Sequence, residues 1–171
     1  MSEQLLPGYI IRRGSALDRS LLLKFMQRTY QDLFPNEDFS HLEQTVKQYF
    51  SSDTPLWWVD FLGEGDQGRN NQYPMPHTQY PIACLWVGNA IDQVHGNRHA
   101  HIFILYVVPE HRRRGIGRAL MRYVENWAIQ RGDRQIGLQV FQSNKPALNL
   151  YNQLGYQTQS LWMVKFLSAE Q

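Results

Sequence analysis

Residues 105–120 read LYVVPEHRRRGIGRAL, and this stretch decides the fold. It joins an apolar run that stops at Pro109 to a run with helical periodicity, and the residues between them carry the spacing Arg-x-x-Gly-x-Gly. Gly115 and Gly117 let the backbone pass close to a ligand, so that several successive N–H groups can point at one anion. The start of the following helix adds the positive end of its dipole. The stretch therefore predicts a pyrophosphate-binding loop between a strand and a helix.

The size and charge of the chain limit what it can bind. It has 171 residues, 43% of them hydrophobic, which suits one domain that buries roughly 70% of the surface its unfolded form exposes. The net charge is only +2, yet four of the seventeen basic residues are Arg112, Arg113, Arg114 and Arg118. Such a concentration favours a small polyanion over extended nucleic acid. We expect a single domain over residues 1–171 and no nucleic acid as partner.

Cys84 is the single cysteine, which excludes an intramolecular disulfide framework and a multi-cysteine metal site. Its apolar neighbours indicate a packed thiol rather than a nucleophile. No apolar segment follows a basic amino terminus, and no run approaches the roughly 18 apolar residues of a membrane span. We expect a soluble cytoplasmic protein that binds neither a metal ion nor a membrane.

Hydrophobic periodicity predicts an α/β fold around a mixed sheet with about four helices. Residues 63–79 are rich in Gly, Asn, Gln and Pro, which predicts a flexible loop. The expected strands are 9–11, 55–62, 80–87, 100–108, 135–141 and a final β segment or pair at 156–166, and the expected helices are 17–34, 41–50, 116–131 and 145–154.

Two motifs together resemble the Gcn5-related N-acetyltransferase (GNAT) superfamily. The first is the stretch at 105–120, similar to the family's strand, pyrophosphate loop and helix. The second is NKPALNLYNQLGY at 144–156, similar to the family's Asn-x-x-Ala-x-x-Leu-Tyr-x-x-Leu-Gly-Phe segment. The motifs occur in the family's order, and the resemblance covers most of the chain. It implies a single N-acetyltransferase domain of the α/β (α+β) class, with a mixed, mostly antiparallel central sheet flanked by about four helices and with acetyl-CoA as co-substrate.

The resemblance also implies roles for individual residues. Tyr151 would protonate the departing CoA thiolate as general acid, after direct attack of a neutral amine on the thioester in a ternary complex. Asn144 would hydrogen-bond the pantetheine arm, and its seven-residue spacing from Tyr151 places both on one helical face. The acetyl-CoA contacts that the resemblance implies are Tyr106, Val107, Val108, Arg113, Arg114, Gly115, Ile116, Gly117, Arg118, Asn144 and Tyr151.

The general base departs from the family pattern. Ribosomal-protein alanine acetyltransferases carry a glutamate where this chain has Gln139, and an amide cannot accept a proton at neutral pH. Histone-acetyltransferase-like members carry a glutamate at the position of His101, whose imidazole is able to act as a base directly or through water. Glu110, Glu64 and His99 are weaker candidates.

The acceptor is expected to be a primary amine of a small molecule or of a peptide or protein amino terminus. In the family the pocket forms from the loop between the first two helices and from the last strands. Asp32 also lies near that loop, and a solvated acidic turn remains an equal interpretation of the loop. The residues that the resemblance implies for this pocket are Tyr30, Phe34, Glu37, Asp38 and Trp162.

Two other functions stay open at this point. A non-catalytic acyl-CoA-binding sensor or interaction module would keep the loop without turnover, which Gln139 permits. A nucleic-acid or nucleotide module built on the arginines would bind with a steep salt dependence. A dinucleotide-binding fold is disfavoured, because the loop lacks the order Gly-x-Gly-x-x-Gly. The sequence leaves monomer and homodimer equally open.

Overall fold

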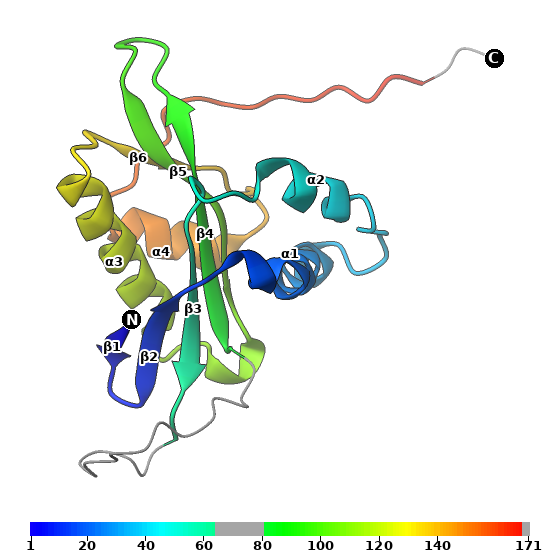
Figure 1. Ribbon diagram of the computed structural model, residues 1–171. Coiled ribbons are helices and arrows are strands. Elements are labelled where there is room, and N and C mark those ends of the chain that lie inside the picture. The colour runs from blue at the N-terminus through cyan, green and yellow to red at the C-terminus, as the bar shows by residue number, and fades with distance from the viewer. Residues whose placement is uncertain (64–80, 169–171) are drawn as a thin grey trace. The chain divides into compact units, whose positions relative to one another are not determined.

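The computed structural model describes residues 1–63 and 81–168 (Figure 1). Almost all of the loop predicted at 63–79 therefore lies outside the described residues. The chain divides into two compact units, Met1–Gln139 and Val140–Gln171, and each is described by itself.

The first unit contains one six-stranded sheet in the order β1-β2-β3-β4-β5-β6. Neighbouring strands from β1 to β5 are antiparallel, whereas β6 runs parallel to β5. The mixed, mostly antiparallel sheet is thus confirmed. The strands are β1 (Ser2–Leu6), β2 (Tyr9–Arg13), β3 (Leu56–Phe61), β4 (Ala83–Ile91), β5 (Arg98–Val107) and β6 (Ile136–Leu138).

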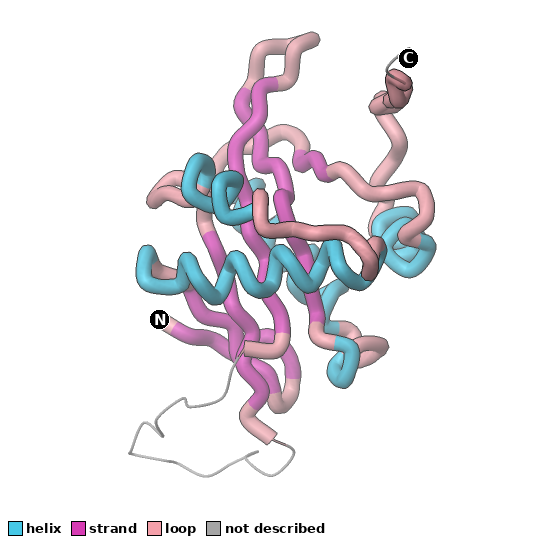
Figure 2. The backbone as a smooth tube through the Cα atoms, turned by 90° about the vertical axis from the view of Figure 1, so that its right-hand side faces the viewer, coloured by secondary structure: helices cyan, strands magenta, loops and turns pink. Residues whose placement is uncertain are grey.

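Helices cover both faces of this sheet. Figures 1 and 2 show α1 (Arg19–Leu33) and α2 (Leu42–Tyr49) on one face, and Figure 1 shows α3 (Ile116–Gln130) on the other. The alternation of side chains along β3 explains the arrangement. The Trp58 ring lies 5.1 Å from Phe25 of α1, whereas the neighbouring Trp57 ring lies 5.3 Å from Trp127 of α3. None of the helices in the described parts of the chain is both long and apolar enough to cross a membrane.

A bulge interrupts β5 in the middle of the sheet. Trp86 pairs with Ile104 and Val87 pairs with Ile102, so Phe103 is an extra residue on β5. The Phe103 ring packs against Trp86 with centroids 4.8 Å apart and occupies the space above Gly88, where a Cβ would lie 2.2 Å from the ring. A bulge of this kind bends a strand and re-aims the residues that follow it.

One predicted strand is shifted in the structure, one is shorter, and one strand is additional. The strand predicted at 80–87 begins later, at Ala83, because Pro81 has no N–H to donate to a sheet, and it continues to Ile91. The strand predicted at 135–141 is shorter, because β6 has only three residues. β1 is not among the predicted strands because its polar start gives no apolar alternation. The Pro7-Gly8 pair that follows is a turn signal that could have revealed the hairpin, since Gly8 adopts φ +79°.

The second unit is built on α4 (Lys145–Gln153). The Asn144 side chain caps the helix by accepting from the Ala147 N–H at 3.3 Å. Gly155 ends it with φ +90°, and the Tyr156 N–H returns to the Tyr151 carbonyl at 3.0 Å. The predicted β segment at 156–166 is wrong for the single chain, because residues 157–168 form neither a strand nor a helix. Strands need a partner edge for their backbone groups.

Candidate functional site

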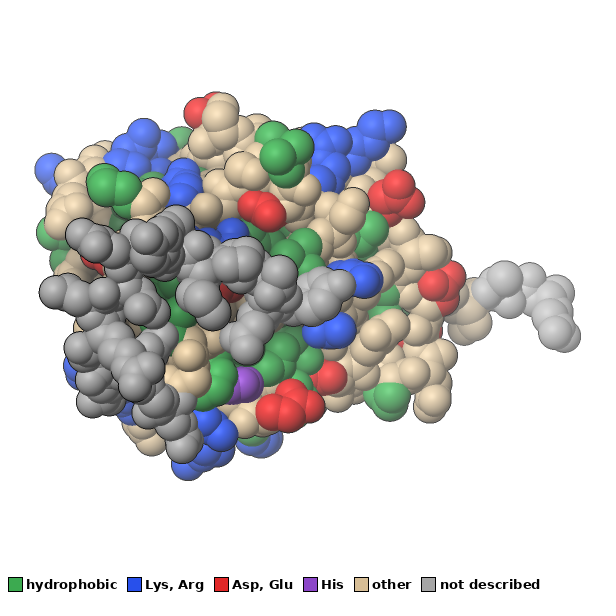
Figure 3. Space-filling model, turned by 60° about the horizontal axis from the view of Figure 1, so that its bottom comes forward, with side chains coloured by type: hydrophobic (Ala, Val, Ile, Leu, Met, Phe, Trp, Pro, Cys, Tyr) green, Lys and Arg blue, Asp and Glu red, His purple; other side chains and the backbone are tan. Residues whose placement is uncertain are grey.

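The loop after β5 has the strained backbone of an anion-binding turn. A short 3-10 turn, Pro109–His111, follows the strand and is closed by the His111 N–H donating to Val108 at 3.0 Å. Arg113 then adopts φ 64°, and Gly115 adopts φ 82° at the start of α3. Left-handed residues alternating with others turn successive N–H groups toward one side. Figure 3 views this end of the molecule, where arginine and lysine side chains gather in several groups.

The amino terminus of α3 completes the loop. The Ala119 N–H donates to the Gly115 carbonyl at 3.0 Å and closes the first helical turn. The N–H groups that precede it, including those of Ile116 and Gly117, therefore point out of the helix end. Together with the helix dipole, these groups form a site for a pyrophosphate or another small anion.

Two arginines of the loop hold its shape. Arg112 donates from Nε to the Val107 carbonyl at 2.8 Å and from Nη2 to Asp32 of α1 at 2.6 Å. Arg114 donates to the Tyr9 hydroxyl at 3.2 Å, and that hydroxyl lies 2.9 Å from His111 Nδ1. The sequence did not indicate these bracing roles, because the partners lie 80 and 105 positions away.

Among the described residues of the first unit, no strand pairs with one edge of β5 where it approaches the loop, and this edge is called open. β6 pairs with β5 from Ala100 to Ile102 and stops at Leu138. The Val108 N–H donates to the carbonyl of Ile82, the residue just before β4, at 2.8 Å. The Val108 N–H therefore points toward the β4 side of the sheet. N–H directions alternate along a strand, so the Val107 N–H points to the opposite, open edge. A ligand along this edge would meet a free main-chain donor just before the loop.

Two histidines lie at the other end of β5. His99 is buried, and its Nδ1 donates to the Ala100 carbonyl at 2.9 Å. His101 is half-buried with its ring 5.8 Å from Phe103. Burial lowers the pKa of His101, and the charge of His99 lowers it further, so the imidazole is neutral at pH 7. Gly137 of β6 leaves room for both rings, since a Cβ there would lie 3.3 Å from His99 and 3.5 Å from His101.

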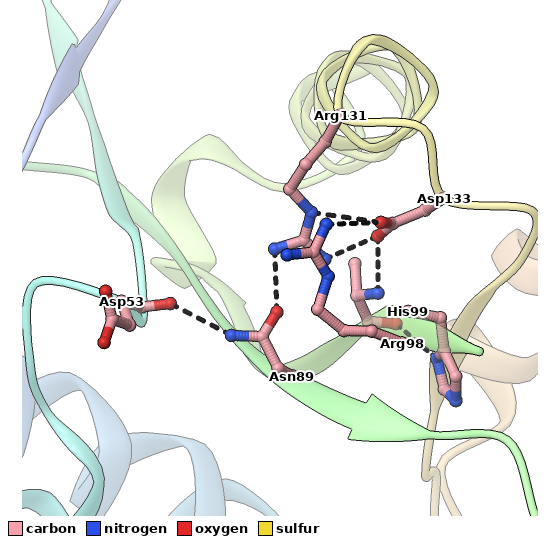
Figure 4. Close-up of polar contacts among 7 residues, drawn as sticks. Asp53, Asn89, Arg98, His99, Arg131 and Asp133 are labelled. Atoms are coloured by element: carbon pink, nitrogen blue, oxygen red, sulfur yellow. Dashed lines mark hydrogen bonds and ion pairs between the residues drawn. The ribbon is translucent and has the colours of Figure 1, made fainter. Parts of the chain in front are cut away.

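A buried carboxylate fixes the strand that carries these histidines (Figure 4). Asp133, whose side chain is 1% exposed, accepts from the Ala100 N–H at 2.7 Å and from Arg131 Nη2 at 2.5 Å, and Arg98 lies 3.5 Å away. Arg131 also donates to Asn89 of β4 at 2.7 Å. Asp133 therefore joins the end of α3 to β5.

The network makes stability depend on acid pH. Burial acts to raise the pKa of Asp133, but hydrogen bonds from Arg131 and Ala100 outweigh it, so this pKa lies below the usual value of about 3.9. A lowered pKa in the folded state stabilises the fold above pH 4, and this contribution disappears as the pH falls through the folded-state pKa. We expect Asp133→Ala to lower the free energy of unfolding at pH 7 by about 1.5–3 kcal/mol.

Urea denaturation between pH 7 and pH 3 measures this effect. The wild type should lose stability faster than Asp133→Asn as the acid range is entered, because only the wild type has the carboxylate to protonate. Equal slopes for the two proteins would contradict the assignment.

Tyr151 lies on α4 of the second unit. Burial raises the pKa of its hydroxyl to about 12, and its ring lies 5.8 Å from Tyr156. The hydroxyl therefore keeps its proton throughout the physiological range. Asn144 precedes it on the same helix, where its oxygen is the helix cap. The prediction that Asn144 and Tyr151 share one helical face assumed a helix from Asn144 onward. In the structure the helix begins at Lys145, and Asn144 is its cap.

The predicted acceptor residues divide between the two units. In the first unit, the Tyr30 ring lies 5.6 Å from Phe39, and Phe34 ends α1 at the molecular surface. Hydrogen bonds from the Ser40 N–H and hydroxyl lower the pKa of Asp38, which shows that this carboxylate closes a local turn. The exposed residues Glu37 and Trp162 complete the predicted set, Glu37 in this turn and Trp162 in the second unit.

Two glutamates, Glu110 and Glu64, are the remaining base candidates. Glu110 lies in the turn after β5 and is exposed, and Glu64 lies outside the described residues.

Cys84 is buried in β4, and burial raises the pKa of its thiol far above the ordinary range. Within residues 1–63 and 81–168, no three His, Cys, Asp or Glu side chains are grouped to hold a metal ion.

The known proteins that this chain is similar to are acetyltransferases. The model of the acetyltransferase (GNAT) family matches residues 23–156. The streptothricin acetyltransferase of Streptomyces lavendulae is 38% identical over 60 residues, which cover 35% of this chain and 32% of that protein. The thialysine N-epsilon-acetyltransferase of Mus musculus is 38% identical over 78 residues, which cover 46% of this chain and 41% of that protein. The matched segments thus span a third to two fifths of these relatives.

Solved structures share the fold at low identity. A predicted acetyltransferase from Clostridium acetobutylicum, solved with acetyl-CoA, superposes with a TM-score of 0.68 at 19% identity, over 92% of this chain and 96% of that one. At this identity the similarity concerns the fold alone.

Proposed function

Because the chain belongs to the acetyltransferase (GNAT) family, whose model matches residues 23–156, we propose that it is an acetyl-CoA-dependent N-acetyltransferase. The observation that carries the proposal is the open edge of β5, which leads directly into the strained loop and the amino terminus of α3. Acetyl-CoA has the matching parts, a pyrophosphate for the loop and an amide-containing arm for a strand edge.

Main-chain groups of the first unit hold the donor in this proposal. The N–H groups around Gly115 and Ile116 bind the pyrophosphate, while the exposed Arg113 side chain adds positive charge outside it. The Val107 N–H points to the open edge, where it is placed to donate to an amide carbonyl of the pantetheine arm, and the arm continues along β5 toward His101. Arg112 supports this donor, because it anchors the carbonyl of the same residue.

His101 takes the proton of the attacking amine, directly or through water. Its neutral state at pH 7 is the form that accepts a proton, and its side chain is only half-buried. Gln139 stands at the family's glutamate position, but its amide cannot accept a proton at neutral pH. His99 is less suited, because its Nδ1 is engaged with the Ala100 carbonyl.

The pH dependence of kcat/KM tests this role. We expect the wild type to lose activity on an acid limb whose midpoint lies below pH 6.5, because the lowered pKa of His101 delays its protonation. His101→Gln should reduce kcat/KM about 100-fold and abolish that limb. His99→Gln is the matched control, and by removing a neighbouring charge it should move the limb to higher pH. A limb that survives in His101→Gln would show that another group is the base.

We propose a cationic primary amine, on a small molecule or a peptide amino terminus, as the acceptor. Support comes from the end of α1 and the turn that follows it, where the exposed Glu37 provides negative charge and Tyr30 provides an aromatic surface. The thialysine N-epsilon-acetyltransferase of Mus musculus carries a name that is compatible with such an acceptor.

A coupled assay with a panel of primary amines tests the whole proposal. Release of CoA should require both acetyl-CoA and an amine, and calorimetry should show acetyl-CoA binding without the amine. Gln139 favours one alternative, a module that binds acyl-CoA without turnover. Binding of acetyl-CoA with no CoA release from any amine would support that module over the enzyme.

A further inference from the structure

The loop segment 111–114 is tied at both of its ends to one buried oxygen. The Tyr9 hydroxyl lies 2.9 Å from His111 Nδ1 and accepts from Arg114 Nη1 at 3.2 Å, and Tyr9 is buried in β2. Between these two ends, Arg113 adopts φ 64°. A residue other than glycine keeps such a left-handed backbone only where its surroundings hold it. The Tyr9 hydroxyl therefore bridges the strained part of the loop.

The chemistry of the three groups gives the bridge a direction. The Arg114 guanidinium has only donors, so the Tyr9 oxygen accepts from it and the single hydroxyl proton remains for His111. Burial lowers the pKa of His111, and the charge of Arg114 lowers it further, so the ring is neutral at pH 7 and is able to accept at Nδ1. A hydroxyl that accepts from a charged donor also donates more strongly, so the two hydrogen bonds reinforce each other.

Tyr9 is a fixed point to which a loop can be tied. Its strand, β2, is paired on both sides, with β1 and with β3. Tyr9 itself pairs with Phe61 of β3, and the two ring centroids lie 5.0 Å apart. The Phe61 ring also contacts the His111 ring, with centroids 4.8 Å apart. The sheet therefore holds the loop in place through an apolar contact as well as through the hydroxyl.

We propose that Tyr9 is a positioning residue for the acetyl donor, because its hydroxyl holds segment 111–114 in the conformation that turns the N–H groups at the start of α3 toward a pyrophosphate. The inference rests on the proposed function, since it takes the loop to hold the pyrophosphate of acetyl-CoA. The bridge is made within the protein before the ligand arrives, so binding does not have to order the loop. Loss of the bridge should weaken donor binding and leave the chemical step unchanged.

Calorimetry with acetyl-CoA on the full chain gives the first test. Tyr9→Phe should raise the Kd about fivefold to tenfold, the effect of one or two lost hydrogen bonds, while kcat at saturating acetyl-CoA stays within about twofold. Tyr123→Phe is the control, because it removes a hydroxyl that hydrogen-bonds Glu3 and not the loop, and its Kd should stay within about twofold. A wild type that does not bind acetyl-CoA would overturn the proposed function and this inference together. Equal Kd values for wild type and Tyr9→Phe would overturn this inference alone.

Substitutions at His111 test whether the effect passes through the bridge. His111→Leu removes the acceptor and should raise the Kd for acetyl-CoA about threefold to fivefold, whereas His111→Asn keeps an acceptor near the Nδ1 position and should stay within about twofold of the wild type. The double variant Tyr9→Phe with His111→Leu should bind acetyl-CoA about as tightly as Tyr9→Phe alone, because both changes break the same bridge. Losses that multiply in the double variant, or a loss in His111→Asn as large as in His111→Leu, would overturn the proposal.

Discussion

Tyr151→Phe should lower kcat by about 10²- to 10⁴-fold while the Kd for acetyl-CoA stays within about twofold. The substitution removes one oxygen and keeps the ring, so packing around α4 is preserved. Burial raises the pKa of the Tyr151 hydroxyl to about 12, and the group therefore holds its proton throughout the assay range. A proton that is always present is what a departing thiolate needs. An assay of CoA release measures kcat, and calorimetry measures the Kd for acetyl-CoA.

Tyr156→Phe is the matched control for that experiment. Its ring lies 5.8 Å from Tyr151 on the same unit, and we expect its kcat to stay within about twofold of the wild type. The high pKa of Tyr151 also predicts that kcat at saturating amine stays level up to pH 10, since the acid form is lost only near pH 12. An unchanged kcat in Tyr151→Phe would remove this residue from the mechanism.

The elements with strong local signals were predictable from the sequence. The apolar run that becomes β5, the glycine-spaced loop and the periodic face of α3 all lie within residues 98–130. Their patterns depend on neighbours a few positions away, which a sequence displays directly. The family assignment rests on these residues together with the motif at 144–156, and the matched family model shows it.

The features that shape the site were not predictable, because they depend on distant partners. The bulge at Phe103 arises from packing over Gly88 of another strand. The open edge at Val107 exists because β6 stops early, and no local pattern records where a neighbouring strand ends. Arg112 is the arginine of the Arg-x-x-Gly-x-Gly spacing, yet nothing in that spacing indicates that it braces the loop through Asp32, 80 positions away.

The final β segment shows a third kind of limit. Its composition predicts a strand, and the single chain leaves it unpaired, because strand formation depends on an available edge as well as on propensity. Position 139 shows the same dependence for chemistry. The resemblance leads to the expectation of a glutamate at position 139, where this chain has Gln139. Only the surroundings of His101, which lower its pKa, indicate an alternative base.

Arg12→Ala should lower the free energy of unfolding by about 3–5 kcal/mol, the largest stability loss that we expect from one substitution in the sheet. Arg12 of β2 donates from Nε to Asp60 of β3 at 2.6 Å, and the Asp60 side chain is only 3% exposed. This bond reaches Oδ2, and among the described residues the other oxygen, Asp60 Oδ1, has no hydrogen-bond partner. Removing the guanidinium therefore leaves a buried carboxylate without its compensating charge, at the strand pair on which β4 and β5 are built.

A double-mutant cycle identifies the cause of that loss. Arg12→Ala with Asp60→Ala should be more stable than Arg12→Ala alone, because the unpaired charge is gone and only packing is lost. Arg13→Ala is the matched single control. Arg13 is the next residue of β2, its guanidinium lies 4.8 Å from the Trp57 ring, and its removal should cost about 0.5–1 kcal/mol. If urea denaturation gave Arg12→Ala and Arg13→Ala the same small loss, the buried pair would not be a major support of the sheet.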